Sequence, residues 1–219
     1  LSQFGFGATI DFDDVTHKGI TNISTDDVAV AQELGYVIKL VGDVREVESG
    51  ISAEVSPTFL PKNHPLASVN DVMNAVFVES IGIGESMYYG PGAGQKPTAT
   101  SVLADIIRIA RRLSDGNVGK PFNEFRRDLP LANPADVKSN YCFALDTPDE
   151  KGKILHLSEI FNSEDISFEQ VLQQKANGTT ARIVVITHAM SKTQLKAVTE
   201  KLEAAEDFTV VNTLKVLSN

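Results

Sequence analysis

The segment from Gly90 to Thr98 carries residue types and spacing that favour contact with a ligand. It reads Gly-Pro-Gly-Ala-Gly-Gln-Lys-Pro-Thr and lies between a predicted strand and a predicted helix. Glycines let a backbone approach a ligand closely, and the free N–H groups at a helix N-terminus favour an anion or a polar group. The spacing matches neither the phosphate-binding loop nor the dinucleotide fingerprint. A tight strand-to-helix crossing is the alternative interpretation.

The turn over residues 146–152, Asp-Thr-Pro-Asp-Glu-Lys-Gly, is a second candidate site. It joins a predicted strand to a predicted helix, so helix amides and Gly152 would face whatever binds there. A carboxylate suits such a position because the helix dipole favours negative charge. The alternative is an ordinary exposed loop.

The remaining reactive side chains do not assemble an active site. The four histidines, at positions 17, 64, 156 and 188, lack the spacing of metal ligands, so no metal site is predicted. The acidic pairs at 13–14 and 26–27 fit helix caps or turns. Cys142 has no accompanying Cys-His motif, which favours a structural thiol.

Composition excludes several classes of protein. The 219 residues, 42% of them hydrophobic, are enough for one large domain or two small ones with a buried core. The net charge of -9 argues against nucleic acid and against an anionic membrane surface as partners. No apolar run approaches the ~20 residues of a membrane-spanning helix. The single cysteine cannot form an internal disulfide, so a cytoplasmic location is expected.

The pattern predicts an α+β fold in which an antiparallel-rich sheet with helices is followed by a ferredoxin-like module. In the first part, a capping motif at Ser24 opens a helix over 24–35, and a second helix runs from about Pro97 to Leu113. Two hairpins are predicted, with strands over 36–44 and 51–59 and over 75–80 and 85–89. Glycines and prolines make 114–138 an irregular crossover.

The order of elements over residues 139–219 is βαββαβ, which is typical of a ferredoxin-like module. Its helices begin near Ile154 and at a capping box that opens at Ser191. Strands are predicted over 141–145, 166–173, 183–187 and 208–217, with a hairpin turn at 176–179. We therefore predict two domains, 1–138 and 139–219.

The chain opens with Leu-Ser-Gln-Phe-Gly-Phe-Gly and no Met. An apolar start that runs into glycines is typical of the last turn of a helix. We therefore expect the chain to be a fragment.

Several motifs together resemble homoserine dehydrogenase, in the C-terminal part of that family's sequence. They are Gly5–Gly7, Gly19–Ile20, Gly35–Leu40, Pro57–Pro61, His64–Leu66, Asn74–Val78 and Gly90–Val102. The tail resembles the ACT domain that many of these enzymes carry, through Gly152, Ile166–Glu169 and Ile183–His188. The resemblance is specific because several motifs occur in the same order as in the family.

The resemblance implies an enzyme that interconverts L-homoserine and L-aspartate 4-semialdehyde with NAD(P), on the route to threonine and methionine. The family's Rossmann domain and catalytic lysine would precede Leu1, so no catalytic residue is assigned in this chain. The chain alone is then expected to bind no cofactor and to be inactive. In the intact enzyme, Gly90, Gly92 and Gly94 would lie near the nicotinamide cofactor. The helix from Pro97 would pack on the missing domain.

The ACT resemblance implies an effector site at Asp149, Lys151, Gly152, Lys153 and Ile154, with threonine as the expected effector. It also implies a homodimer or higher homo-oligomer formed through this domain. The sequence Asp-Glu-Lys-Gly at 149–152 departs from the Asp-x-Pro-Gly of many ACT loops, and the missing proline loosens the turn. Two alternatives stay open: a stand-alone amino-acid-binding regulator and a purely structural oligomerisation module.

Overall fold

The computed structural model describes residues 1–117, 125–174 and 179–217. These residues form two compact units, one built from 1–61 and 126–219 and the other from 62–125. The helices and strands of the first unit are α1 (Ser2–Phe6), β1 (Thr16–His17), α2 (Thr25–Glu33), β2 (Tyr36–Val47), β3 (Gly50–Pro61), β6 (Lys138–Pro148), α4 (Lys153–Asn162), β7 (Phe168–Gln174), β8 (Thr180–Thr187), β9 (Met190–Ser191), α5 (Lys192–Ala204) and β10 (Thr209–Val216), with a short 3-10 turn, Phe12–Asp14.

Local signals place α2 and the hairpin after it where the sequence predicts them. The Ser24 hydroxyl accepts a hydrogen bond from the Asp27 N–H, and the Asp27 carboxylate accepts one from the Ser24 N–H. This reciprocal box satisfies two amides that the helix itself leaves free. The hairpin pairs β2 with β3 from Tyr36↔Pro61 to Val47↔Gly50, so both strands are longer than predicted.

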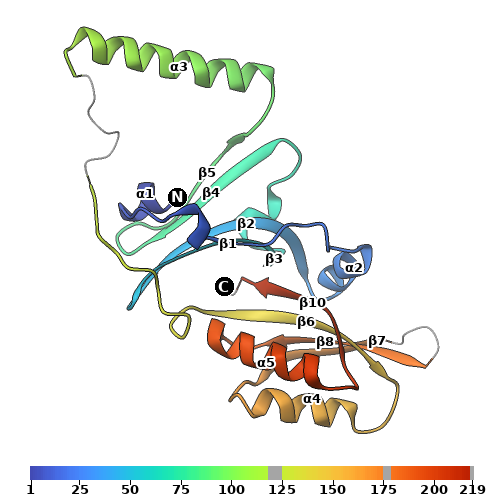
Figure 1. Ribbon diagram of the computed structural model, residues 1–219. Coiled ribbons are helices and arrows are strands. Elements are labelled where there is room, and N and C mark those ends of the chain that lie inside the picture. Colours follow the sequence, from blue (N-terminus) through green and yellow to red (C-terminus); the bar gives the residue numbers. More distant parts are fainter. Residues whose placement is uncertain (118–124, 175–178, 218–219) are drawn as a thin grey trace. The chain divides into compact units, whose positions relative to one another are not determined.

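The ferredoxin-like order is confirmed from β6 to β10. Its four long strands lie in the order β10-β6-β8-β7, and all of these neighbours are antiparallel. Helices α4 and α5 cover one face of this sheet (Figure 1). Their buried side chains, Leu157 and Phe161 from α4 and Val198 and Leu202 from α5, pack against Phe143 and its neighbours on that face.

The other face of the same sheet is covered by residues from the start of the chain. Val30 and Ala31 of α2 and Phe59 of β3 pack against the alternate residues Cys142 and Ala144 of β6. Strand β10 also pairs with β3 in parallel, through Lys215↔Thr58 and Val216↔Phe59. The sheet therefore continues across the predicted boundary at 138/139, and the division into two sequence domains at that point stays a prediction.

The second unit contains a hairpin and a long helix. A short 3-10 helix, Pro65–Ser68, precedes β4 (Met73–Ser80) and β5 (Gly84–Pro91), which pair from Met73↔Pro91 to Ser80↔Gly84. Helix α3 (Gln95–Ser114) follows, and its predicted apolar face, including Val102, Ile106 and Ile109, is more than half exposed. Hairpin and helix thus match the prediction in type, with bounds that differ by a few residues.

The remaining expectations are met in part. Gly7 ends α1 in the left-handed conformation, at φ 67°, as the glycine pattern predicts. The described part of the crossover is irregular, although Leu131 forms an isolated bridge with Ile51. Residues 118–124 of the crossover and 176–178 of the predicted hairpin turn lie outside the described residues. Among the described residues, no helix is long and apolar enough to cross a membrane.

Candidate functional site

The loop between β6 and α4 owes its shape to Gly152. This residue is the N-cap of α4 and has φ +93°, a left-handed conformation that L side chains rarely adopt. Its carbonyl accepts the first helical hydrogen bond, from the His156 N–H at 2.9 Å. Glycine has no side chain to cap the first turn, so the amides of that turn stay available to an external acceptor.

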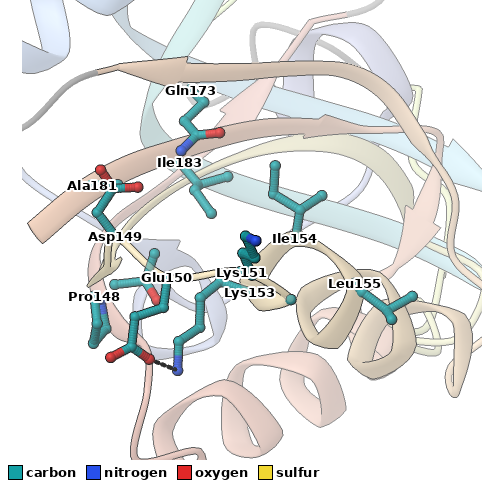
Figure 2. A pocket seen from close by; sticks show the side chains of 12 residues that line it. Pro148, Asp149, Glu150, Lys151, Lys153, Ile154, Leu155, Gln173, Ala181 and Ile183 are labelled. Atoms are coloured by element: carbon teal, nitrogen blue, oxygen red, sulfur yellow. Dashed lines mark ion pairs between the residues drawn. The ribbon is translucent and has the colours of Figure 1, made fainter.

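The loop borders a pocket of about 290 Å³ (Figure 2). All five residues of the predicted effector site contribute to its lining. Ile154 extends from α4 toward the strands that carry Gln173 and Ile183. The volume lies at the lower end of the range for ligand pockets, about 300–1,000 Å³, which fits a ligand of a few heavy atoms. The role of these five residues in binding stays a prediction.

The two lysines of the loop differ in their partners. Lys153 Nζ lies 3.5 Å from Glu150 and 3.3 Å from Asp207, so it is held by carboxylates of the protein itself. The ion pairs of the described residues do not include Lys151, whose side chain is exposed. Lys151 is therefore the ammonium group of the loop that is better placed to meet a carboxylate from solution.

Asp207 holds the start of α4 through two side chains. Besides its contact with Lys153, its carboxylate lies 2.9 Å from His156 Nδ1. Burial by itself would raise the pKa of Asp207. Hydrogen bonds from His156 and Lys153 outweigh this effect and hold the pKa of Asp207 below its usual range. The carboxylate is thus charged at neutral pH, and its charge helps to fix the start of α4.

The pocket is also lined by strand residues that the sequence analysis did not predict. Thr147, Ala181 and Ile183 line it from β6 and β8, and Gln173 from β7. Thr147 and Ala181 are register partners across β6 and β8. Strand alternation could identify the residues of one face, but only the pairing register brings them to the same pocket.

A second hollow, of about 710 Å³, also borders this loop. It shares Thr147, Pro148, Asp149 and Glu150 with the first pocket. Its further lining adds Glu206 and Asp207, with no lysine or arginine among the lining residues described. Both hollows thus carry the carboxylates of Asp149 and Glu150, and among the lining residues described lysines occur in the smaller one alone.

The glycine-rich segment lies in the second unit, where two of its glycines have local structural reasons. A Cβ on Gly92 would lie 1.9 Å from the Asn74 side chain, and the Gly92 N–H donates to the Val72 carbonyl at 2.9 Å. Gly94 is the N-cap of α3 with φ +116°. A Cβ on Gly90 would meet nothing within 4 Å.

These facts bear on whether the segment fits a nicotinamide cofactor. Gly90 leaves open space for a flat ring to approach, whereas the space and the amide of Gly92 are taken by the protein itself. Open space at Gly90 is compatible with such a ring, whereas Gly92 and Gly94 have reasons within the protein itself. The predicted cofactor contacts of Gly90, Gly92 and Gly94 stay predictions.

The thiol and the possible metal ligands of the described residues offer no further reactive site. Cys142 is buried in the sheet, and burial, followed by the charge of Asp27, raises its pKa to about 12. Such a thiol is protonated at neutral pH and is a poor nucleophile. Within the described ranges, no group of three or more His, Cys, Asp or Glu side chains could hold a metal ion.

Comparison with known proteins gives a consistent result. Residues 1–107 match the family described as homoserine dehydrogenase. The homoserine dehydrogenase of Lactococcus lactis is 58% identical over 219 residues, which is 100% of this chain and 51% of that protein. The crystal structure of a homoserine dehydrogenase from Thiobacillus denitrificans aligns with 99% of this chain and 51% of its own, at a TM-score of 0.89 and 29% identity.

A Staphylococcus aureus homoserine dehydrogenase structure aligns with 100% of this chain and 50% of its own, at a TM-score of 0.68 and 26% identity. The chain therefore spans about half the length of the curated relatives it matches. The fold, with its mixed sheet and helices, agrees with these structural neighbours.

Proposed function

From the premise that this chain belongs to the homoserine dehydrogenase family, we propose that it supplies the C-terminal half of such an enzyme. In this role, residues up to about 138 form part of the substrate domain and residues 139–219 form an ACT domain that senses an amino acid. The intact enzyme interconverts L-homoserine and L-aspartate 4-semialdehyde with NAD(P). Threonine is the proposed effector, since it lies downstream of homoserine and suits feedback control.

The observation that carries the sensing role is the pocket at the β6–α4 loop. The five predicted effector residues border one cavity of about 290 Å³, next to a helix N-terminus whose N-cap has no side chain. An amino acid could place its carboxylate at these amides and near Lys151. This geometry supports a small zwitterionic ligand.

The proposal assigns no catalytic residue to this chain. The sequence has no dinucleotide fingerprint, and in its glycine-rich segment the space beside Gly92 is occupied by Asn74. When bound in the intact enzyme, the nicotinamide ring would supply or accept the hydride. This chain would contribute Gly90 and its neighbours as a surface against that ring. We therefore propose that the chain alone does not oxidise homoserine.

The proposal includes a homodimer or a higher homo-oligomer formed through the ACT domain in the cytoplasm. Among the described residues, β7 is an edge strand of the large sheet, and its Val171 is 47% exposed. An edge strand of this kind offers free backbone groups for pairing with a second copy. Sedimentation of the purified chain at several concentrations tests this part.

Isothermal titration of the purified chain with L-threonine tests the sensing role, and L-isoleucine, L-methionine and L-lysine serve as comparison ligands. Saturable binding of threonine is expected. The Gly152→Asp variant should abolish it, because it places a strained residue and a negative charge at the amides that receive the carboxylate. If none of the four amino acids bound, the proposed sensing role of this chain would be contradicted.

An activity assay with L-homoserine and NAD or NADP tests the catalytic part separately. We expect no reduction of the cofactor above the background rate. Turnover at a rate that scales with the concentration of this chain would contradict the proposal that the catalytic machinery lies elsewhere in the intact enzyme.

A further inference from the structure

The Thr147 hydroxyl ends a row of aromatic and aliphatic side chains along β6. Residues of a strand alternate between faces, and the preceding residues on the Thr147 face of β6 are Tyr141, Phe143 and Leu145, all in the core under α4 and α5. Thr147 continues this row at the end next to the β6–α4 loop and is 2% exposed. Packing alone would favour an aliphatic residue there.

The hydroxyl has no hydrogen-bond partner among the described residues. Thr147 Oγ1 is one of two buried side-chain oxygens of the described residues in this condition, and the other is Thr213 Oγ1. Buried polar groups are nearly always paired, so an orphaned hydroxyl needs a reason. A partner that is absent from the free protein is one such reason.

Thr147 is also placed where a ligand would meet it. Thr147 is among the residues that line both hollows next to the β6–α4 loop. In the smaller pocket its other neighbours include the aliphatic side chains of Ile154, Ala181 and Ile183. Rotation about χ1 exchanges the hydroxyl and the methyl group of a threonine between staggered positions. A change of χ1 is the smallest movement that could turn the buried hydroxyl toward the pocket.

We propose that Thr147 determines the specificity of this pocket by forming a hydrogen bond with a polar group on the ligand's side chain. The inference rests on the proposed amino-acid sensing and adds a selection rule to it. Charged groups of the loop recognise the ends that every amino acid shares. The aliphatic wall and the Thr147 hydroxyl then favour a short side chain that combines a methyl group with a hydroxyl over an aliphatic chain of the same shape.

Titration of the wild-type chain with L-threonine and L-valine tests this rule, because the two ligands differ by a hydroxyl in place of a methyl group. Wild type should prefer threonine by roughly tenfold, the effect of one hydrogen bond. Thr147→Val should abolish this preference with an unchanged far-UV circular dichroism spectrum. Thr147→Ser keeps the hydroxyl and should keep the preference.

Thr213→Val is the matched control, since Thr213 carries the other orphaned hydroxyl and lines neither hollow. It should bind both ligands as wild type does. Equal preference in wild type and Thr147→Val, or a loss of preference in Thr213→Val of the same size, would overturn the inference. Binding of both ligands by wild type without discrimination would also overturn it and leave the sensing role intact, whereas no binding by wild type would refute the sensing role itself.

Discussion

Lys215 Nζ, on the last strand of the chain, donates a hydrogen bond to Asp43 Oδ2 on β2 at 2.6 Å, although 172 positions separate the two residues. Asp43 lies directly opposite Glu54 in the β2–β3 ladder, a pairing of like charges that destabilises a hairpin. Lys215 also contacts Glu54. The ammonium group thus joins Arg45 at Asp43 and Lys192 at Glu54 in offsetting the repulsion between the two carboxylates.

Replacement of this buried lysine is expected to destabilise the first unit. The Lys215 side chain is only 5% exposed, and Lys215→Met would leave Asp43 and Glu54 with a partly uncompensated negative charge. Breaking a buried pair from one side costs about 3 kcal/mol or more. Urea denaturation followed by circular dichroism should show this loss in the free energy of unfolding.

Lys196→Met is the control, because Lys196 is 80% exposed and pairs only loosely, at 3.9 Å, with Glu200. Its free energy of unfolding should change by less than about 0.5 kcal/mol. Equal effects of the two substitutions would mean that the Lys215 cluster does not stabilise the fold.

The same cluster predicts a loss of stability in acid. Burial by itself would raise the pKa of Asp43 and of Glu54, but Lys215 outweighs it, together with Arg45 at Asp43 and Lys192 at Glu54, so both pKa values are lowered. The unfolded chain then binds more protons than the folded one, and stability rises with pH. The contribution is complete above the ordinary values of 3.8 and 4.5 and is lost as pH falls through the lowered ones.

Urea midpoints measured between pH 7 and pH 3 should therefore fall on the acid side. In Lys215→Met, burial raises the pKa of Asp43 and of Glu54 with less opposition from positive charge, so acid destabilises the variant less than wild type. The difference between their urea midpoints should therefore narrow toward pH 3. A constant gap across this range would exclude the two carboxylates as its source.

The single cysteine provides a probe of the sheet. Cys142 is 3% exposed between α2 and the strands, and burial raises its pKa to about 12. A thiol reagent such as Ellman's reagent reacts with the thiolate, so native protein at pH 8 should react only as fast as it opens. One thiol per chain should react promptly in concentrated urea. Prompt reaction in native protein would contradict the packing of this face.

Gly50 marks a second close contact within the first unit. A Cβ at this position would lie 2.1 Å from the carbonyl oxygen of Pro130, and the residue has φ +144°. Gly50→Ala should displace the 130–132 segment from β3 and cost about 2–4 kcal/mol in the free energy of unfolding. Gly19→Ala, where a Cβ meets nothing within 4 Å, should stay within about 0.5 kcal/mol of wild type. Similar urea midpoints for the two variants would contradict the described contact.

Much of the local structure could be predicted because its causes are close together in the chain. The boxes at Ser24 and Ser191 each join residues three positions apart, so their spacing alone signals a helix start. The β2–β3 hairpin follows from two strand-like runs around a polar turn. Gly152 was singled out as the last residue of a strand-to-helix turn, and its left-handed conformation is seen only in the structure.

The candidate site could be predicted only along its loop. The resemblance to an ACT loop assigns Asp149, Lys151, Gly152, Lys153 and Ile154 together, since they lie within six consecutive positions. Thr147, Gln173 and Ala181 reach the same pocket from three strands, and the period of a strand gives its faces but not its register with a neighbour. The binding role of the loop remains a prediction.

The sequence by itself determined the family resemblance, the βαββαβ order and the positions of the helix caps, because each depends on residue types at short, fixed spacing. Only the tertiary structure decided that β10 pairs with β3 and that Lys215 lies between Asp43 and Glu54. These contacts join residues more than 150 positions apart, and chain spacing carries no record of which strand edges meet. Burial makes the contacts of Lys215 important for stability, because a charge removed from water needs partners of opposite charge. Only folding brings those partners to Lys215.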